Sequence, residues 1–312
     1  MTTQTRRDWV VIGVPTSAGA HHAGQDRAPA ALRAAGLIGR LEAAGLAVTD
    51  AGDLAGGLFT VDHEHPRARN LDAVVRVARE VADAVASQLV AGRRPLVVGG
   101  DCTVTLGVIA GFRRAHKDVG LAYVDGDADL GAVLSDEASG ILDSAGIAHL
   151  LGLGEPDLAG LAGETPLLHG SRIAMVGCDP REVTDAGRAF LAERGVSYTE
   201  GPELAADPAG AAQKALAALA RGPGGRPSAE ALGAPLVVHF DVDVVDSGDL
   251  PLGNYPHYDS GVRLEDVTAC LRVLLADPFC TGLVLTEVNP SYDPGGNSLD
   301  RYLTALTAAL AG

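Results

Sequence analysis

Three aspartates alternate in the segment "YVDGDADL" (123–130), and their spacing suggests a metal site. Asp125, Asp127 and Asp129 follow an apolar run, and side chains two residues apart on a β-strand share one face. Carboxylates that close repel one another and raise each other's pKa unless a cation lies among them. Oxygen ligands of this kind suit Mn²⁺, Mg²⁺ or Ca²⁺. We therefore interpret the segment as part of a metal centre.

Further chemically active residues end other apolar runs of the chain. The runs are "VVGGDC", "VVHFDVDVVD" and "VLTEVNP", and they supply Asp101, Cys102, Asp241, Asp243 and Glu287. A single aspartate after a strand is commonly the cap of the next helix. Two clusters of alternating aspartates are hard to explain in that way, so the sequence favours a metal centre.

The pattern of apolar residues predicts the elements that must position these side chains. Short apolar runs predict strands at 9–14, 95–100, 120–125, 172–177, 235–243 and 281–288. Helical periodicity predicts helices at 27–43, 71–90, 183–194, 208–221, 263–276 and 298–311. Apolar strands separated by helices indicate an α/β fold in three layers, with a mostly parallel sheet between helices. Ligands of such sheets bind beyond the carboxyl ends of the strands, where the acidic residues lie.

Composition narrows the class of protein. The 312 residues have a net charge of −16 and are 47% hydrophobic, and we expect one domain over 1–312. The charge argues against a nucleic-acid partner and suits a small cationic substrate. No apolar run approaches the ~18 residues of a membrane span, so we expect no membrane partner. The four cysteines lack a CxxC spacing, which suits reduced thiols in the cytoplasm.

The motifs resemble those of the ureohydrolase superfamily, which contains arginase, agmatinase and formiminoglutamase. The segments that carry the resemblance are "GGDCTVTLG" (99–107), "DGDAD" (125–129), "HFDVDVVD" (239–246) and "TEVNPSYD" (286–293). The N-terminal segment 12–37 and the segment 139–152 are also similar to the family pattern. Order and spacing agree over nearly the whole chain, so the resemblance implies an arginase-like fold.

The resemblance also implies a reaction and its ligands. Family members use two Mn²⁺ ions bridged by hydroxide to hydrolyse a C–N bond of a guanidino or amidine compound. Carried over by position, one ion would bind residue 102 with Asp125, Asp129 and Asp241. The other would bind residue 127 with Asp125, Asp241 and Asp243. Asp129 would also hold the hydroxide, and Glu287 would face the substrate cation.

The chain departs from the family at both histidine ligands, which are replaced by Cys102 and Asp127. Both replacements can still ligate a metal, but they make the ligand set more anionic. A thiolate favours Zn²⁺ or Fe over Mn²⁺. The alternative interpretation of Cys102 is a small buried thiol without a ligand role.

The residues expected to serve the substrate and the proton transfer also differ from the family. The family's proton-relay histidine is replaced by Asp143, and an exposed aspartate is a poor acid at neutral pH. His149 and His257 are the other candidates, although a lone loop histidine is often simply solvated. Ser139 is retained and is expected to contact substrate together with Glu287 and His257. Gly131 replaces a family asparagine, which argues against L-arginine as the substrate.

Three functions fit these observations. The first is hydrolysis of a guanidino, N-hydroxyguanidino or amidine compound by a metal-bridged hydroxide, and one family branch that acts on N-hydroxyarginine also has cysteine at the first ligand position. The second is an altered Fe or Zn²⁺ site with different chemistry. The third is a non-catalytic relative that binds metal or ligand. The resemblance further implies a homo-oligomer, either a trimer or a hexamer.

Overall fold

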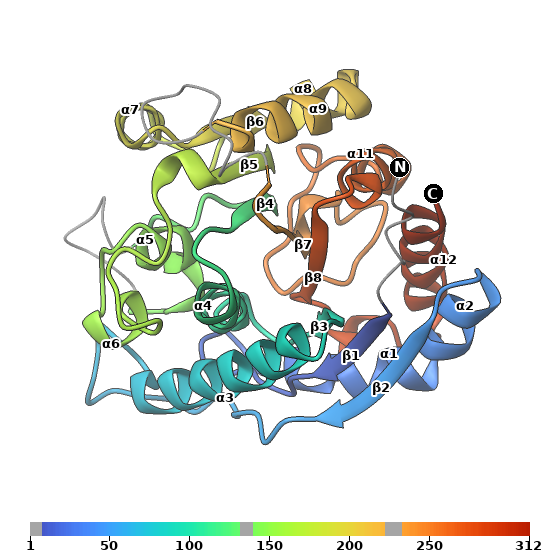
Figure 1. Ribbon diagram of the computed structural model, residues 1–312, viewed down its shortest axis with the longest axis horizontal. Helices are drawn as coiled ribbons and strands as arrows, with labels where there is room; N and C mark the ends of the chain where they lie inside the picture. The colour runs from blue at the N-terminus through green and yellow to red at the C-terminus, as the bar shows by residue number, and fades with distance from the viewer. Residues whose placement is uncertain (1–7, 132–139, 222–232) are drawn as a thin grey trace.

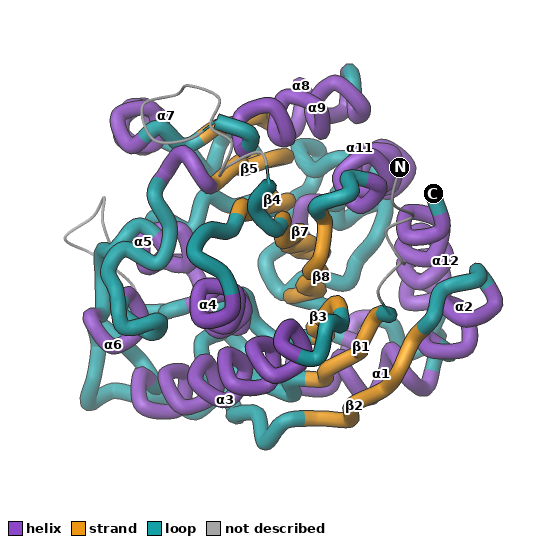
Figure 2. The backbone as a smooth tube through the Cα atoms, in the orientation of Figure 1, coloured by secondary structure: helices purple, strands orange, loops and turns teal. Residues whose placement is uncertain are grey.

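The computed structural model describes residues 8–131, 140–221 and 233–312, and a single eight-stranded parallel sheet crosses it (Figures 1 and 2). The strands run in the order β2-β1-β3-β8-β7-β4-β5-β6. Their bounds are β1 Trp9–Gly13, β2 Val48–Asp53, β3 Arg94–Val98, β4 Gly120–Val124, β5 Ile173–Cys178, β6 Ser197–Glu200, β7 Leu236–Asp241 and β8 Cys280–Thr286.

Helices cover both faces of the sheet and enclose two apolar cores, which confirms the predicted three-layer α/β fold (Figure 1). One face is covered by α1 Ala28–Ala34, α2 Leu37–Ala43, α8 Gly201–Ala206, α9 Pro208–Leu219, α11 Leu264–Ala276 and α12 Asn297–Ala311. The other is covered by α3 Leu71–Val90, α4 Val104–Ala115, α5 Gly146–Leu150, α6 Pro156–Ala159 and α7 Asp185–Arg194. Successive strand residues alternate between the cores: Val11 belongs to the first, and Val10 and Ile12 to the second. No helix of the described residues is long and apolar enough to cross a membrane.

All six predicted strands are present, and the differences from the sequence prediction have identifiable causes. The predicted helix 27–43 is two helices, because Gly36 adopts a left-handed backbone (φ 91°) between α1 and α2. Helix α4 was not predicted, since it is buried on almost every side and lacks a polar face. Strands β2 and β6 were also not predicted, because they are the edge strands and carry polar residues.

Four strands in the middle of the sheet bring the acidic segments together. Because β3, β8, β7 and β4 are neighbours, their carboxyl ends meet along one edge. The register pairs Val124 of β4 with Phe240 of β7, and Asp241 of β7 with Thr286 of β8. The residues that come after these strands therefore lie side by side, although they are far apart in the sequence.

Candidate metal centre

The turn after β3 carries Cys102 to the edge of the sheet. A Cβ atom at Gly100 would lie 1.6 Å from the carbonyl oxygen of Thr16, so only glycine fits this close approach. Asp101 fixes the turn by accepting hydrogen bonds from the backbone N–H groups of Gly19 (3.0 Å) and Thr103 (3.1 Å). Asp101 is thereby explained as a structural residue, and Cys102 begins the approach to α4 with its thiol buried.

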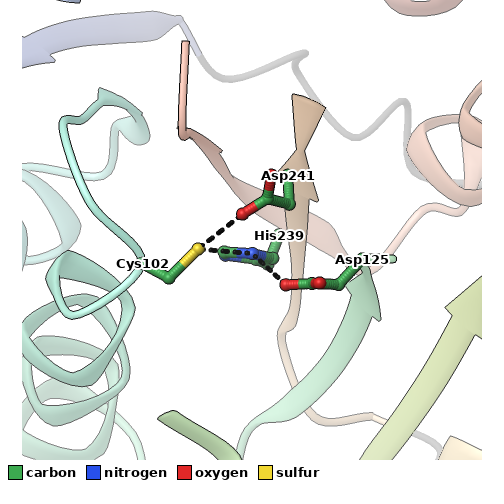
Figure 3. Close-up of side chains that lie close together, drawn as sticks. All are labelled: Cys102, Asp125, His239 and Asp241. Carbon is green, nitrogen blue, oxygen red and sulfur yellow. Dashed lines mark hydrogen bonds and ion pairs between the residues drawn. The ribbon is translucent and has the colours of Figure 1, made fainter. Parts of the chain in front are cut away.

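Cys102, Asp125, His239 and Asp241 form a fully buried group, which we call the inner cluster (Figure 3). One potential ligand atom from each residue lies within 4.8 Å of every other. The Cys102 Sγ atom is 2.6 Å from Oδ2 of Asp241 and 3.6 Å from Nε2 of His239. The same Nε2 atom is 3.5 Å from Oδ2 of Asp125. Sulfur, nitrogen and oxygen donors thus surround one point.

His239 was not singled out from the sequence, yet it is held firmly in this cluster. Its Nδ1 atom is 2.7 Å from the hydroxyl of Thr105, and its ring stacks on Tyr123 with centroids 4.0 Å apart. Burial lowers the pKa of His239 to about 3, so the ring is a neutral imidazole at neutral pH. A sequence signal did exist, because His239 lies two residues before Asp241 on β7 and therefore on the same face.

Asp127, Asp243 and His257 form a second group, which we call the outer cluster. The Nε2 atom of His257 is 3.7 Å from Oδ1 of Asp127, and Nδ1 is 3.2 Å from Oδ2 of Asp179. His257 is buried rather than solvated, with 2% of its surface exposed. The side chain of Asp127 is 25% exposed, so this cluster reaches toward solvent.

The two D-x-D segments join the clusters in the same way. The backbone N–H of Asp127 donates to Oδ1 of Asp125 at 2.6 Å, and that of Asp243 donates to Oδ1 of Asp241 at 2.8 Å. However, β4 ends at Val124, so the first segment is a loop and does not present its three aspartates on one face of a strand as predicted. Each segment instead gives one aspartate to each cluster.

Asp129 lies beside the clusters but belongs to none of the ligand groups found in the described residues. Its Oδ2 atom accepts a hydrogen bond of 2.5 Å from the Tyr123 hydroxyl. Burial raises the pKa of Asp129 to about 7, and the bond from Tyr123 opposes this shift. Its backbone has a positive φ of 48°, a strained conformation that recurs at functional sites.

Asp143 and Glu287 form a third group with Cys102. Asp143 was expected to be exposed, but it is buried and its Oδ1 atom accepts the backbone N–H of Cys102 at 2.7 Å. Burial and the neighbouring carboxylates, first Glu287, raise the pKa of Asp143 well above its usual value. Glu287 accepts a hydrogen bond of 2.9 Å from the Gln25 amide, and its backbone φ is also positive at 62°.

The other candidates of the sequence analysis lie elsewhere. His149 is buried outside these groups, with Nδ1 2.7 Å from the carbonyl oxygen of Ala145. Ser139 lies outside the described residues. All four cysteines are free and buried.

The buried carboxyl groups leave a large uncompensated charge. Burial, in most cases reinforced by repulsion from neighbouring carboxylates, raises the pKa of Asp101, Asp125, Asp127, Asp129, Asp143, Asp241, Asp243 and Glu287. Within the described part of the chain, the ion pairs of these groups are with His239 and His257 rather than with arginine or lysine. Among the side chains of these three groups, as far as the structure describes them, two buried atoms lack a hydrogen-bond partner: Nε2 of His257 and Oε1 of Glu287. Divalent cations would satisfy both the charge and the unpaired atoms, so the residues fit a metal centre.

A pocket of about 310 Å³ opens beside the outer cluster. Asp127 and Asp129 form part of its wall, together with Glu182. Its rim includes His21 and Tyr255, whose rings lie 6.0 Å apart. The pocket is therefore acidic and has room for a small molecule next to the metal ligands.

Comparison with known proteins gives one consistent result. The family model described as "Arginase family" matches residues 7–311. Arginase of Brevibacillus brevis is 29% identical over 309 residues, which cover 97% of each chain. Arginase of Bacillus caldovelox is 28% identical over 305 residues, again 97% of each chain. The solved structure of the Bacillus caldovelox enzyme superposes with a TM-score of 0.82 at 26% identity and covers 98% of both chains.

Proposed function

Since the chain belongs to the arginase family, we propose that it is a metal-dependent hydrolase that cleaves a C–N bond of a small guanidino, N-hydroxyguanidino or amidine compound. Family relatives support metal-dependent hydrolysis of guanidino groups in general. The observation that carries the proposal is the pair of ligand clusters, one buried and one at the wall of an acidic pocket. A guanidinium or amidinium cation would be attracted to this pocket by its carboxylates.

Five of the six predicted ligands divide between the two clusters, and Asp129 belongs to neither. Cys102, Asp125 and Asp241 would hold one ion, and Asp127 and Asp243 would hold the other. Bound divalent ions supply Lewis acidity and allow water to act as a nucleophile at neutral pH. We propose Mn²⁺ for the carboxylate-rich centre, while the Cys102 thiol makes Fe²⁺ or Zn²⁺ the competing ions.

The remaining side chains would bind the substrate and manage protons. Asp129, at the pocket wall and bonded to Tyr123, would accept and hold a proton at its carboxylate. Glu287 would neutralise the substrate cation with its unpartnered oxygen, Oε1. Asp143 and His257 are the two candidates for proton relay, and Asp143, whose Oδ1 atom accepts the backbone N–H of Cys102, takes this role where His257 binds an ion. Ser139 would contribute to substrate binding.

We further propose a cytoplasmic homo-oligomer, either a trimer or a hexamer. The free, buried cysteines suit a reducing compartment. Light scattering on the purified protein measures the oligomeric state, and a monomer would exclude this part of the proposal.

Metal analysis followed by a substrate screen tests the function. The protein is reconstituted with Mn²⁺, Fe²⁺ or Zn²⁺ and offered L-arginine, N-hydroxy-L-arginine, agmatine and formiminoglutamate, with release of urea, hydroxyurea or formamide as the readout. We expect turnover of a compound other than L-arginine. Asp129→Asn should retain metal and lose about 10²–10⁴-fold in rate, whereas the surface change Asp157→Asn should have no effect. Metal-loaded protein that hydrolyses none of these compounds would contradict the proposal and favour a non-catalytic or altered metal site.

A further inference from the structure

We infer that His239 and His257, neither of which occupies a position where the family pattern has a ligand, are metal ligands of this chain. His239 would complete the inner cluster as its nitrogen donor, and His257 would complete the outer cluster. The inference rests on the proposed metal centre but not on the proposed reaction.

The distances around both histidines suit ligands of a common ion better than hydrogen-bond partners. His239 Nε2 is 3.5 Å from Asp125 Oδ2, and His257 Nε2 is 3.7 Å from Asp127 Oδ1. These separations are longer than the 2.7–3.2 Å of an N–H···O hydrogen bond. Two ligand atoms that each lie about 2.1 Å from a tetrahedral ion are roughly 3.4 Å apart. The 2.6 Å between Cys102 Sγ and Asp241 Oδ2 is shorter, so this pair must separate when an ion enters.

Both rings are also oriented in the way that metal-bound histidines are. A ligating histidine uses its second ring nitrogen for a hydrogen bond that fixes the ring and its tautomer. Nδ1 of His239 is bonded to the Thr105 hydroxyl, and Nδ1 of His257 is paired with the Asp179 carboxylate. Asp179 is in turn bound by Arg181 at 2.8 Å. In each case Nε2 is the atom that faces the carboxylates.

His257 provides the strongest evidence that a ligand is required. Its Nε2 atom is buried without a hydrogen-bond partner and points toward Asp127. A buried polar atom without a partner destabilises the fold, and an ion held by Asp127 and Asp243 would satisfy Nε2 of His257. A Cβ at Gly126 would lie 2.8 Å from this atom, so the glycine keeps the approach open. His149 is equally buried and its Nε2 atom also lacks a partner, but none of the ligand groups of the described residues includes it, which makes it a matched control.

The donor sets of the two clusters differ. The inner cluster offers four protein donors, one sulfur, one nitrogen and two oxygens, all buried. The outer cluster offers three, and Asp127 borders the pocket. Structural metal sites are closed by four protein ligands, whereas catalytic sites keep three and leave a position for substrate or water. The geometry thus makes the inner ion the enclosed one and the outer ion the one that faces the substrate.

X-ray absorption spectroscopy on the wild-type protein loaded with Co²⁺ tests the inference directly. The six ligands predicted by position include no histidine: Cys102, Asp125, Asp127, Asp129, Asp241 and Asp243. Imidazole scattering in the spectrum must therefore come from residues outside this set. We expect one imidazole neighbour at each ion, and a sulfur neighbour at the inner ion. A spectrum without imidazole scattering would overturn the inference, whether or not the protein hydrolyses anything.

Variants assign the signal to each histidine. His239→Gln and His257→Gln should each lose about one of two bound ions, measured by mass spectrometry after dialysis, and one of two imidazole contributions. His149→Gln should retain both ions. Full metal content in both ligand variants, with unchanged spectra, would overturn the assignment. A protein that binds metal through these histidines but is inactive would contradict the proposed function alone.

Discussion

The inner and outer clusters are built from matching D-x-D segments, but they differ in their distance from solvent. The inner cluster is buried in all four residues, between β4, β7 and the start of α4. The outer cluster includes Asp127, whose side chain is 25% exposed at the wall of the pocket. The difference follows from the position of each aspartate relative to its strand. Asp125 directly follows β4 and Asp241 ends β7, whereas Asp127 and Asp243 lie two residues further along the chain.

The two clusters are expected to differ in role, the inner one in stability and the outer one in turnover. Deeply buried carboxylates need either a counter-charge or a proton, so an ion in the inner cluster would allow its carboxyl groups to stay ionised. The outer cluster is where a substrate in the pocket could approach an ion. We therefore expect changes in the inner cluster to affect stability most, and changes in the outer cluster to affect turnover most.

The largest expected effect is the loss of turnover in Asp127→Ala, which contrasts with a loss of stability in Cys102→Ala. Asp127→Ala should remove the outer ion and lower kcat by about a thousandfold, because a bound metal lowers the activation barrier by several kcal/mol and about 1.4 kcal/mol corresponds to a tenfold change in rate. Cys102→Ala should instead lower the melting temperature of the metal-loaded protein more than Asp127→Ala does. Metal content, kcat and thermal unfolding of both variants measure the contrast. Equal effects of the two variants on stability and rate would show that the clusters are not distinct.

The pH dependence of the metal-free protein gives the second effect. The buried carboxyl groups have raised pKa values in the folded protein. Their contribution to the stability of the fold is therefore complete below about pH 4, where they are protonated in both states, and is lost as the pH rises through the folded pKa. For Asp129 that rise is from 3.8 to about 7, and at about 1.4 kcal/mol per pKa unit it costs about 4 kcal/mol at alkaline pH.

Urea unfolding of chelator-treated and metal-loaded protein between about pH 5 and pH 8 checks this expectation. The metal-free protein should lose stability toward pH 8, while the loaded protein should not, because bound cations compensate the carboxylates. Metal-free protein that is as stable at pH 8 as at pH 5 would show that the carboxyls are balanced without an ion.

The smallest effect compares the groups behind the two histidines. Thr105→Val removes the partner of His239 Nδ1, and Asp179→Asn weakens the partner of His257 Nδ1. Each should lower the affinity of its own ion by about 10–100-fold without abolishing binding. Titration of the metal-free variants with Co²⁺ measures both affinities. A loss confined to the other cluster, or no loss in either variant, would contradict the assigned pairs.

Much of the fold can be predicted from local patterns in the chain. The six apolar strands and the helix 71–90 agree with the structure because their periodicity is set by which face is buried. Some elements that are almost wholly buried, or that lie at the edges of the sheet, were not predicted. Helix α4 lies so close to α3 that a Cβ at Gly107 would be 2.5 Å from the carbonyl oxygen of Ala78, and it has no polar face. The edge strands β2 and β6 have too little apolar pattern.

The sequence by itself determined the kinds of ligand and the edge of the sheet where they gather, because parallel strands place the residues beyond their carboxyl ends on one side of the sheet. Only the tertiary structure decided which residues meet. His239 reaches Cys102 across 137 positions, and His257 reaches Asp179 across 78, through a strand order that no local pattern encodes. It also buried Asp143 and His257, which the sequence left open to solvent. Burial and contact depend on the neighbouring elements, and for that reason the two histidines became visible only once the sheet was assembled.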